Sequence, residues 1–150
     1  MNLGTALART GEPDAAHAAY ERALAIDPSH TSTRLNLALL HSERERFEES
    51  VREYESILAT RPEHAKALSG LGFALASLGR PEQATARFRA AIAADPRLTP
   101  AYNGLALALE SLGETGEALR TWRRALEIAP EEWRLRANLA VALASSGRTS

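Results

Sequence analysis

The chain has 150 residues, of which 45% are hydrophobic and 25% charged, and its formal net charge is −1. This composition predicts one folded, soluble domain, and it lacks the basic field with which proteins neutralise nucleic acid. The absence of cysteine excludes disulfides, iron–sulfur clusters, thiolate zinc sites and cysteine nucleophiles.

Proline interrupts the apolar pattern at regular intervals. Successive interruptions lie 34 residues apart, at Pro28, Pro62, Pro96 and Pro130. Proline has no N–H and disfavours helix in the residue before it, so each of these positions should follow the end of a helix. A turn signal divides each interval, at Gly11, Glu45, Gly79, Gly113 and Gly147.

Between these breaks, apolar residues recur at spacings of three and four, which is typical of helices with one apolar face. Pro13 and Pro81 follow turn glycines by two residues and suit the first turn of a helix. In chain order, the sequence predicts helices over 1–10, 13–26, 32–44, 47–59, 64–78, 81–94, 99–112, 115–129 and 131–146. No strands are expected.

Each interval also repeats a small residue and, four positions later, an aromatic one. The small residues are Ala16, Ser50, Ala84 and Ala118, and the aromatics are Tyr20, Tyr54, Phe88 and Trp122. Small residues allow two antiparallel helices to approach closely, and the aromatic ring fills the space beside them. A single helical hairpin leaves one apolar side uncovered, so stacking of the next hairpin is expected to cover it.

Residues 65–98 contain Leu68, Leu71, Gly72, Leu75, Ala84, Phe88 and Pro96 in the order of a known repeat pattern. With this pattern the whole chain resembles the tetratricopeptide repeat family. The resemblance implies an all-α, right-handed α-solenoid of stacked antiparallel helix pairs, with about four repeats and a final unpaired helix. We expect a single array, part of a longer one, with units 1–30, 31–64, 65–98, 99–132 and a partial unit 133–150.

Two segments depart from the pattern. Residues 41–50 carry His41, Glu45 and Ser50 where other units have Leu, Gly and Ala. We expect a solvated helix end and turn there, with a local partner contact as the alternative, and we expect His41 to be hydrogen-bonded at the edge of the helix interface. The helix predicted over 131–146 has apolar residues around much of its surface, which favours association through the chain ends.

The sequence contains no recognisable catalytic or metal-binding motif. Its four histidines include no pair spaced by four residues, and Gly70-Leu71-Gly72 falls inside a predicted helix rather than in a phosphate-binding loop. We therefore expect no catalytic residues, no metal and no cofactor. No apolar run is long enough to span a bilayer and no signal peptide is evident, so we expect no membrane insertion and a cytoplasmic location.

The resemblance implies a concave groove lined by the first helix of each unit, in which family members hold peptides. One row of positions carries Asn2, Asn36, Gly70, Gly104 and Asn138, and a second carries Leu39, Phe73, Leu107 and Val141. Flanking positions carry Arg9, Ser32, Glu43, Lys66, Ser69, Asn103, Glu110 and Arg134.

Amides at these positions could pair with a peptide backbone, and glycines could admit it closely. Alternatively, the asparagines tie neighbouring helices together and the apolar row packs against the adjacent unit. Only Lys66 and Asn36 match the clamp with which some relatives bind chaperone tails, so that role is not expected. The leading hypothesis is a non-enzymatic scaffold that binds a protein or peptide partner. The alternatives are a regulatory or substrate-presenting part of a larger enzyme and a module that forms homo-oligomers through its end helices.

Overall fold

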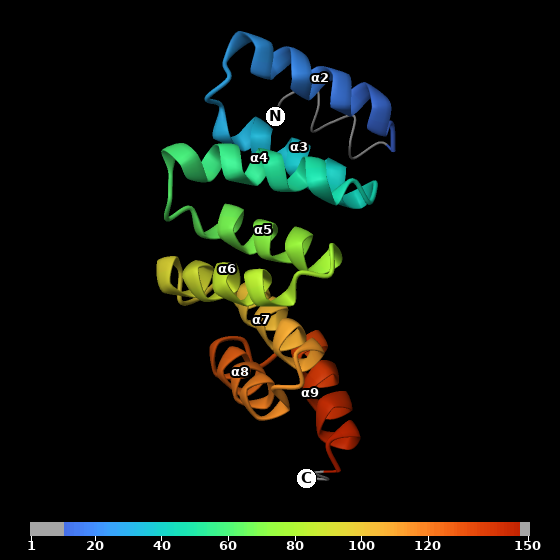
Figure 1. Cartoon of the computed structure of the whole chain (residues 1–150), viewed down its shortest axis with the longest axis vertical. Helices are drawn as coiled ribbons and strands as arrows, with labels where there is room; N and C mark the ends of the chain where they lie inside the picture. The colour runs from blue at the N-terminus through green and yellow to red at the C-terminus, as the bar shows by residue number, and fades with distance from the viewer. Residues whose placement is uncertain (1–10, 148–150) are drawn as a thin grey trace.

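The computed structural model describes residues 11–147, and every regular element in this range is a helix (Figure 1). The helices are α2 (Pro13–Ile26), α3 (Thr31–Glu43), α4 (Phe47–Thr60), α5 (Ala65–Ser77), α6 (Pro81–Ala94), α7 (Thr99–Ser111), α8 (Thr115–Ile128) and α9 (Trp133–Ser145). Their bounds agree with the predicted ones to within two residues. The helix predicted over 1–10 lies outside the described residues.

The helices are stacked in the order of the sequence. Figure 1 shows them following one another along the long axis, from α2 near one end to α9 near the other. Each described helix packs against the helix before it and the helix after it, and α5 also contacts the first helices α3 and α7. This arrangement is a solenoid of antiparallel helix pairs, and it confirms the predicted all-α fold.

The core includes the small and aromatic residues that the repeat predicted. Ala16, Ser50, Ala84 and Ala118 are completely buried, and the aromatic rings that follow them are at most 2% exposed. An apolar cluster runs continuously from Ala38 in α3 to Ala142 in α9. Since each pair covers the apolar side of its predecessor, the core extends along the stack instead of closing into a sphere.

The turn inside each helix pair has the same geometry. Gly79, Gly113 and Glu45 all have positive φ, and the residue that follows each of them donates a backbone hydrogen bond to the first helix. A left-handed residue after a helix terminates it and satisfies its last carbonyl groups. The sequence therefore located these turns correctly, including the one where Glu45 replaces glycine.

The predicted solvated segment at 41–50 is only partly correct. Glu45 is exposed, but His41 is 6% exposed and Ser50 is fully buried. Ser50 Oγ lies 2.9 Å from the carbonyl oxygen of Ala38, to which it donates, and 2.7 Å from Ser42 Oγ. A small hydroxyl can be buried where alanine usually stands because a neighbouring helix supplies its partner.

The expected hydrogen bond of His41 is absent from the described part of the chain, where its Nδ1 is buried without a partner. The ring of His17 in α2 lies edge-on to it, with centroids 5.3 Å apart. Burial lowers the pKa of His41, and His17 and Arg46 lower it further, while Glu53 and Glu49 in α4 act in the opposite direction. The neutral ring is therefore favoured, as in an apolar core position.

We expect His41→Leu to raise the free energy of unfolding, by about 1 kcal/mol near neutral pH, because it removes a buried polar atom without a partner. The pKa of His41 is lower in the folded chain than in the unfolded chain, where it is about 6.5. The free energy of unfolding is therefore unaffected by His41 above about pH 6.5, and it falls as the pH drops from there through the pKa of the folded chain. The variant should lose less stability on acidification. Urea unfolding at several pH values measures this, and an unchanged pH slope would show that His41 does not contribute.

Candidate functional site

A row of large apolar side chains lies exposed along the first helices. Leu39, Phe73, Leu107 and Val141 are 52%, 39%, 43% and 69% exposed, and they belong to α3, α5, α7 and α9. In the described residues, only two other large apolar side chains, Ile26 and Trp133, are exposed to this extent. Most of the exposed large apolar side chains therefore belong to this row. Packing against the adjacent unit covers the row only in part.

The first of two depressions along this row lies between α3 and α5 and has a volume of about 410 Å³. Lys66 is its only charged lining residue, and the chain segment before and at the start of α7 closes one side. Its lining residues are Leu35, Asn36, Leu39, Tyr54, Lys66, Ser69, Gly70, Phe73, Leu98 and Pro100.

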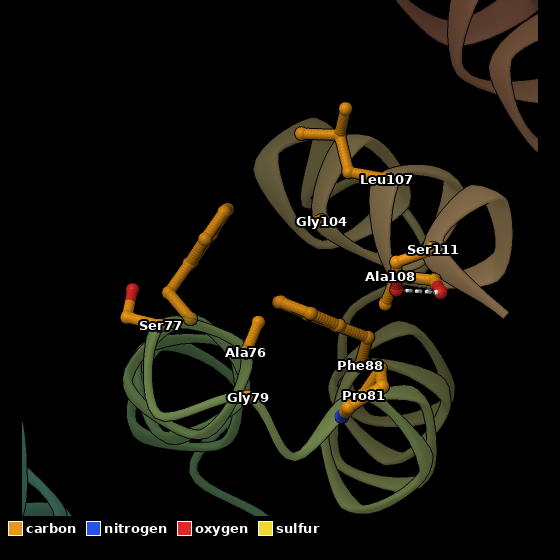
Figure 2. A pocket seen from close by; sticks show the side chains of 10 residues that line it. Ala76, Ser77, Gly79, Pro81, Phe88, Gly104, Leu107, Ala108 and Ser111 are labelled. Atoms are coloured by element: carbon orange, nitrogen blue, oxygen red, sulfur yellow. Dashed lines mark hydrogen bonds between the residues drawn. The ribbon is translucent and has the colours of Figure 1, made fainter.

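The second depression lies between α5 and α7, has a volume of about 520 Å³ and is lined entirely by uncharged residues. Figure 2 shows Phe88 reaching from α6 between the helix of Ala76 and the helix of Gly104. The lining residues are Phe73, Ala76, Ser77, Gly79, Pro81, Phe88, Gly104, Leu107, Ala108 and Ser111.

Phe73 borders both depressions, so they adjoin along the row. Its ring meets the buried ring of Phe88 edge-on, with centroids 4.9 Å apart, which is a favourable aromatic geometry. This contact fixes the position of Phe73 while leaving part of its ring exposed. We call the two depressions together the groove.

The glycines of the inner row admit the protein's own aromatic rings. A Cβ atom added to Gly70 would overlap the ring of Tyr54, and one added to Gly104 would overlap the ring of Phe88. Both glycines also line the groove. The aromatic rings of the core therefore require glycine at these two positions, and close approach of a peptide backbone stays a prediction.

The asparagines have different roles along the stack. Asn103 Oδ1 accepts hydrogen bonds from Trp122 Nε1 at 2.9 Å and from Asn138 Nδ2 at 2.8 Å. These bonds connect α7, α8 and α9, so the alternative in which asparagines tie neighbouring helices applies to Asn103 and Asn138. Asn36 lines the first depression.

Several predicted residues lie outside the groove. Arg134 stacks over the ring of Trp133 at 5.6 Å and, like Val141, lines neither depression. The flanking residues Ser32, Glu43 and Glu110 line neither depression either, and Asn2 and Arg9 lie outside the described residues. Sequence reasoning missed the contributions of second helices and connecting segments, of which Tyr54, Pro81 and Leu98 are examples, and that of Pro100 in the first turn of α7.

Two of the four histidines cap helices. His30 accepts a hydrogen bond from the backbone N–H of Thr33 at 3.3 Å, and His64 accepts one from Ala67 at 3.2 Å. Within residues 11–147, no three His, Asp or Glu side chains are grouped so as to hold a metal ion. In the same range no helix is both long and apolar enough to cross a membrane.

Comparison of the sequence with models of known protein families identifies the repeat. A model described as tetratricopeptide repeat matches residues 35–150, and a second model with the same description matches residues 1–40. The chain belongs to the tetratricopeptide repeat family. Members of this family are generally non-catalytic interaction modules. A search among curated proteins finds no match to this chain.

Solved structures of other tetratricopeptide repeat proteins share the fold. MamA is 24% identical, with 99% of this chain and 86% of that chain covered and a TM-score of 0.87. A thermophilic protein of Thermus thermophilus is 25% identical, with coverages of 97% and 80% and a TM-score of 0.82. YrrB, a tetratricopeptide repeat protein with an unusual peptide-binding site, is 22% identical, with coverages of 98% and 76% and a TM-score of 0.76.

Proposed function

We propose that this tetratricopeptide repeat chain is a non-enzymatic scaffold that holds a peptide segment of a partner protein in the groove. The observation that carries the proposal is the exposed apolar row, in which Leu39, Phe73 and Leu107 border two adjoining depressions. Exposed apolar side chains in contiguous hollows of this kind are typical of protein interaction sites.

The lining of the groove restricts the partner segment. A charged side chain in the second depression would lose water without gaining a counter-charge, because all its lining residues are uncharged. Lys66 provides one positive charge at the first depression. The partner segment should therefore place an apolar side chain beside Leu107, and it can place an acidic one beside Lys66.

The proposal is tested by selecting peptides from a random display library against the protein and measuring their affinity for variants. Leu39→Ser with Leu107→Ser should weaken binding about tenfold or more, because central apolar contacts dominate the free energy of such interfaces. Ile26→Ser is the matched control, since Ile26 is 86% exposed and lines neither depression. Equal affinity of the double variant and the control would exclude the groove as the binding site.

Self-association is a second candidate, favoured by the surface of α9. Only Leu135 and Ala142 are buried in this helix, while Trp133 and Val141 are 66% and 69% exposed. A second copy could cover this surface. Light scattering over a concentration series tests the idea, and a mass that remains that of a monomer would exclude it.

A further inference from the structure

A third depression lies outside the groove, between α6, α7 and α8, and has a volume of about 360 Å³. Leu105 of α7 lines this depression, whereas Leu107 of the same helix lines the groove. Residues two apart on a helix point in nearly opposite directions, so this depression faces away from the groove. Its lining residues are Arg89, Ile92, Tyr102, Leu105, Glu117, Arg120, Thr121 and Arg124.

The charges around this depression are mostly positive, with three arginines against one glutamate. Glu117 accepts a hydrogen bond from Arg89 at 3.0 Å, and Arg124 pairs with the neighbouring Glu127 at 2.6 Å. Within the described residues, Arg120 has neither an ion pair nor a hydrogen bond from its side chain. An arginine remains charged at any physiological pH, so the depression holds an unmatched positive charge.

The repeat provides an internal comparison for these arginines. Thirty-four residues earlier, in α6, the positions of Arg120 and Arg124 are occupied by Ala86 and Ala90. The position of Tyr102 is likewise occupied by a leucine in the preceding unit. Helix stacking therefore does not require guanidinium groups here, and alanine at both positions is compatible with a second helix of this fold.

We propose that Arg120 and Arg124 bind an anionic side chain of a partner peptide, a carboxylate or a phosphate ester. Residues four apart lie on adjacent turns of a helix, so Arg120 and Arg124 lie on the same face of α8. The ion pair of Arg124 with Glu127 is exposed on both sides, at 66% and 63%, so Arg124 can exchange this partner for the anion at little cost. Arginine presents a planar fork of donors that matches carboxylate and phosphate oxygens. Ile92 and Tyr102 line the same depression and offer contact to an apolar residue next to the anionic one.

The test uses three synthetic peptides of equal length, in which a leucine adjoins two glutamates, two glutamines or two phosphoserines. Binding is followed by NMR through the amide signals of α6 and α8 and the Nε–Hε signals of the arginines. The glutamate peptide, the phosphoserine peptide or both should bind in a salt-sensitive manner, while the glutamine peptide should not. Arg120→Ala with Arg124→Ala should weaken binding about tenfold or more, since charge-assisted hydrogen bonds are lost.

Arg52→Ala is the matched control, because Arg52 occupies the position of Arg120 in α4 and should not affect binding. Binding of the glutamate peptide alone assigns a carboxylate site, and binding of the phosphoserine peptide alone assigns a phosphate site. Equal binding by the double variant, equal binding of the glutamine peptide, or no binding of either anionic peptide would overturn the proposal. The groove variant with Leu39→Ser and Leu107→Ser should bind these peptides normally, so the two proposals fail independently.

Discussion

Phe88→Ala is expected to lower the free energy of unfolding by about 3–5 kcal/mol, the usual range for removing a buried phenylalanine. Phe88 is completely buried in α6, and its ring contacts Phe73 of α5 while lying close to Gly104 of α7. Its removal would leave a cavity at the centre of three successive helices. Urea unfolding followed by circular dichroism measures the change.

Phe73→Ala is the control for this prediction, because it removes an equal ring on the other side of the same aromatic contact. Phe73 is 39% exposed, so its removal returns less apolar surface to water and leaves no enclosed cavity. The expected loss is less than half of that for Phe88→Ala. Similar losses for both variants would contradict the interpretation of Phe88 as the core residue of its unit.

Gly104→Val is expected to lower the free energy of unfolding by about 3 kcal/mol, at the upper end of the usual cost of overpacking. The ring of Phe88 lies between Gly104 and Gly72, and a Cβ on Gly72 would be only 2.8 Å from Phe88 Cε1. The ring therefore cannot move away from one glycine without approaching the other. Thermal unfolding of the variant measures the loss.

Gly116→Ala serves as the comparison for the glycine prediction. Gly116 lies in the first turn of α8, and a Cβ there would meet only a guanidinium nitrogen of Arg120 at 3.8 Å. Alanine should therefore raise stability by about 0.4–1 kcal/mol, chiefly by restricting the unfolded chain. A loss of stability for Gly104→Val together with a gain for Gly116→Ala would support the interpretation that the ring of Phe88 requires glycine at position 104. Unchanged stability of Gly104→Val would refute it.

The repeat made the fold and the apolar row predictable. A position that recurs every 34 residues takes the same place in every helix pair, so Leu39, Phe73 and Leu107 could be aligned before any coordinates were known. The same regularity located the buried small residues, the aromatic rings and the turns. The division of the chain into units, and its place in a longer array, stay predictions.

Features that occur in a single unit were not predictable in the same way. Ser50 is buried because Ala38 and Ser42 supply its hydrogen-bond partners, and this depends on which side chains face it across the helix pair. Asn103 ties Trp122 to Asn138, a contact made only because all three positions carry compatible groups in these units. The groove walls contributed by Tyr54 and Pro100 depend on the angle between units, which the repeat pattern does not specify.

The most direct test of the groove is to map a library-selected peptide on the protein by NMR. Titration of the isotope-labelled chain should shift the amide signals of α3, α5 and α7, with the largest changes around Leu39, Phe73 and Leu107. Signals of the second helices α4, α6 and α8 should change little, except around Tyr54, Pro81 and Phe88, which line the groove. Shifts concentrated in those second helices, with α3, α5 and α7 unaffected, would contradict binding in the groove.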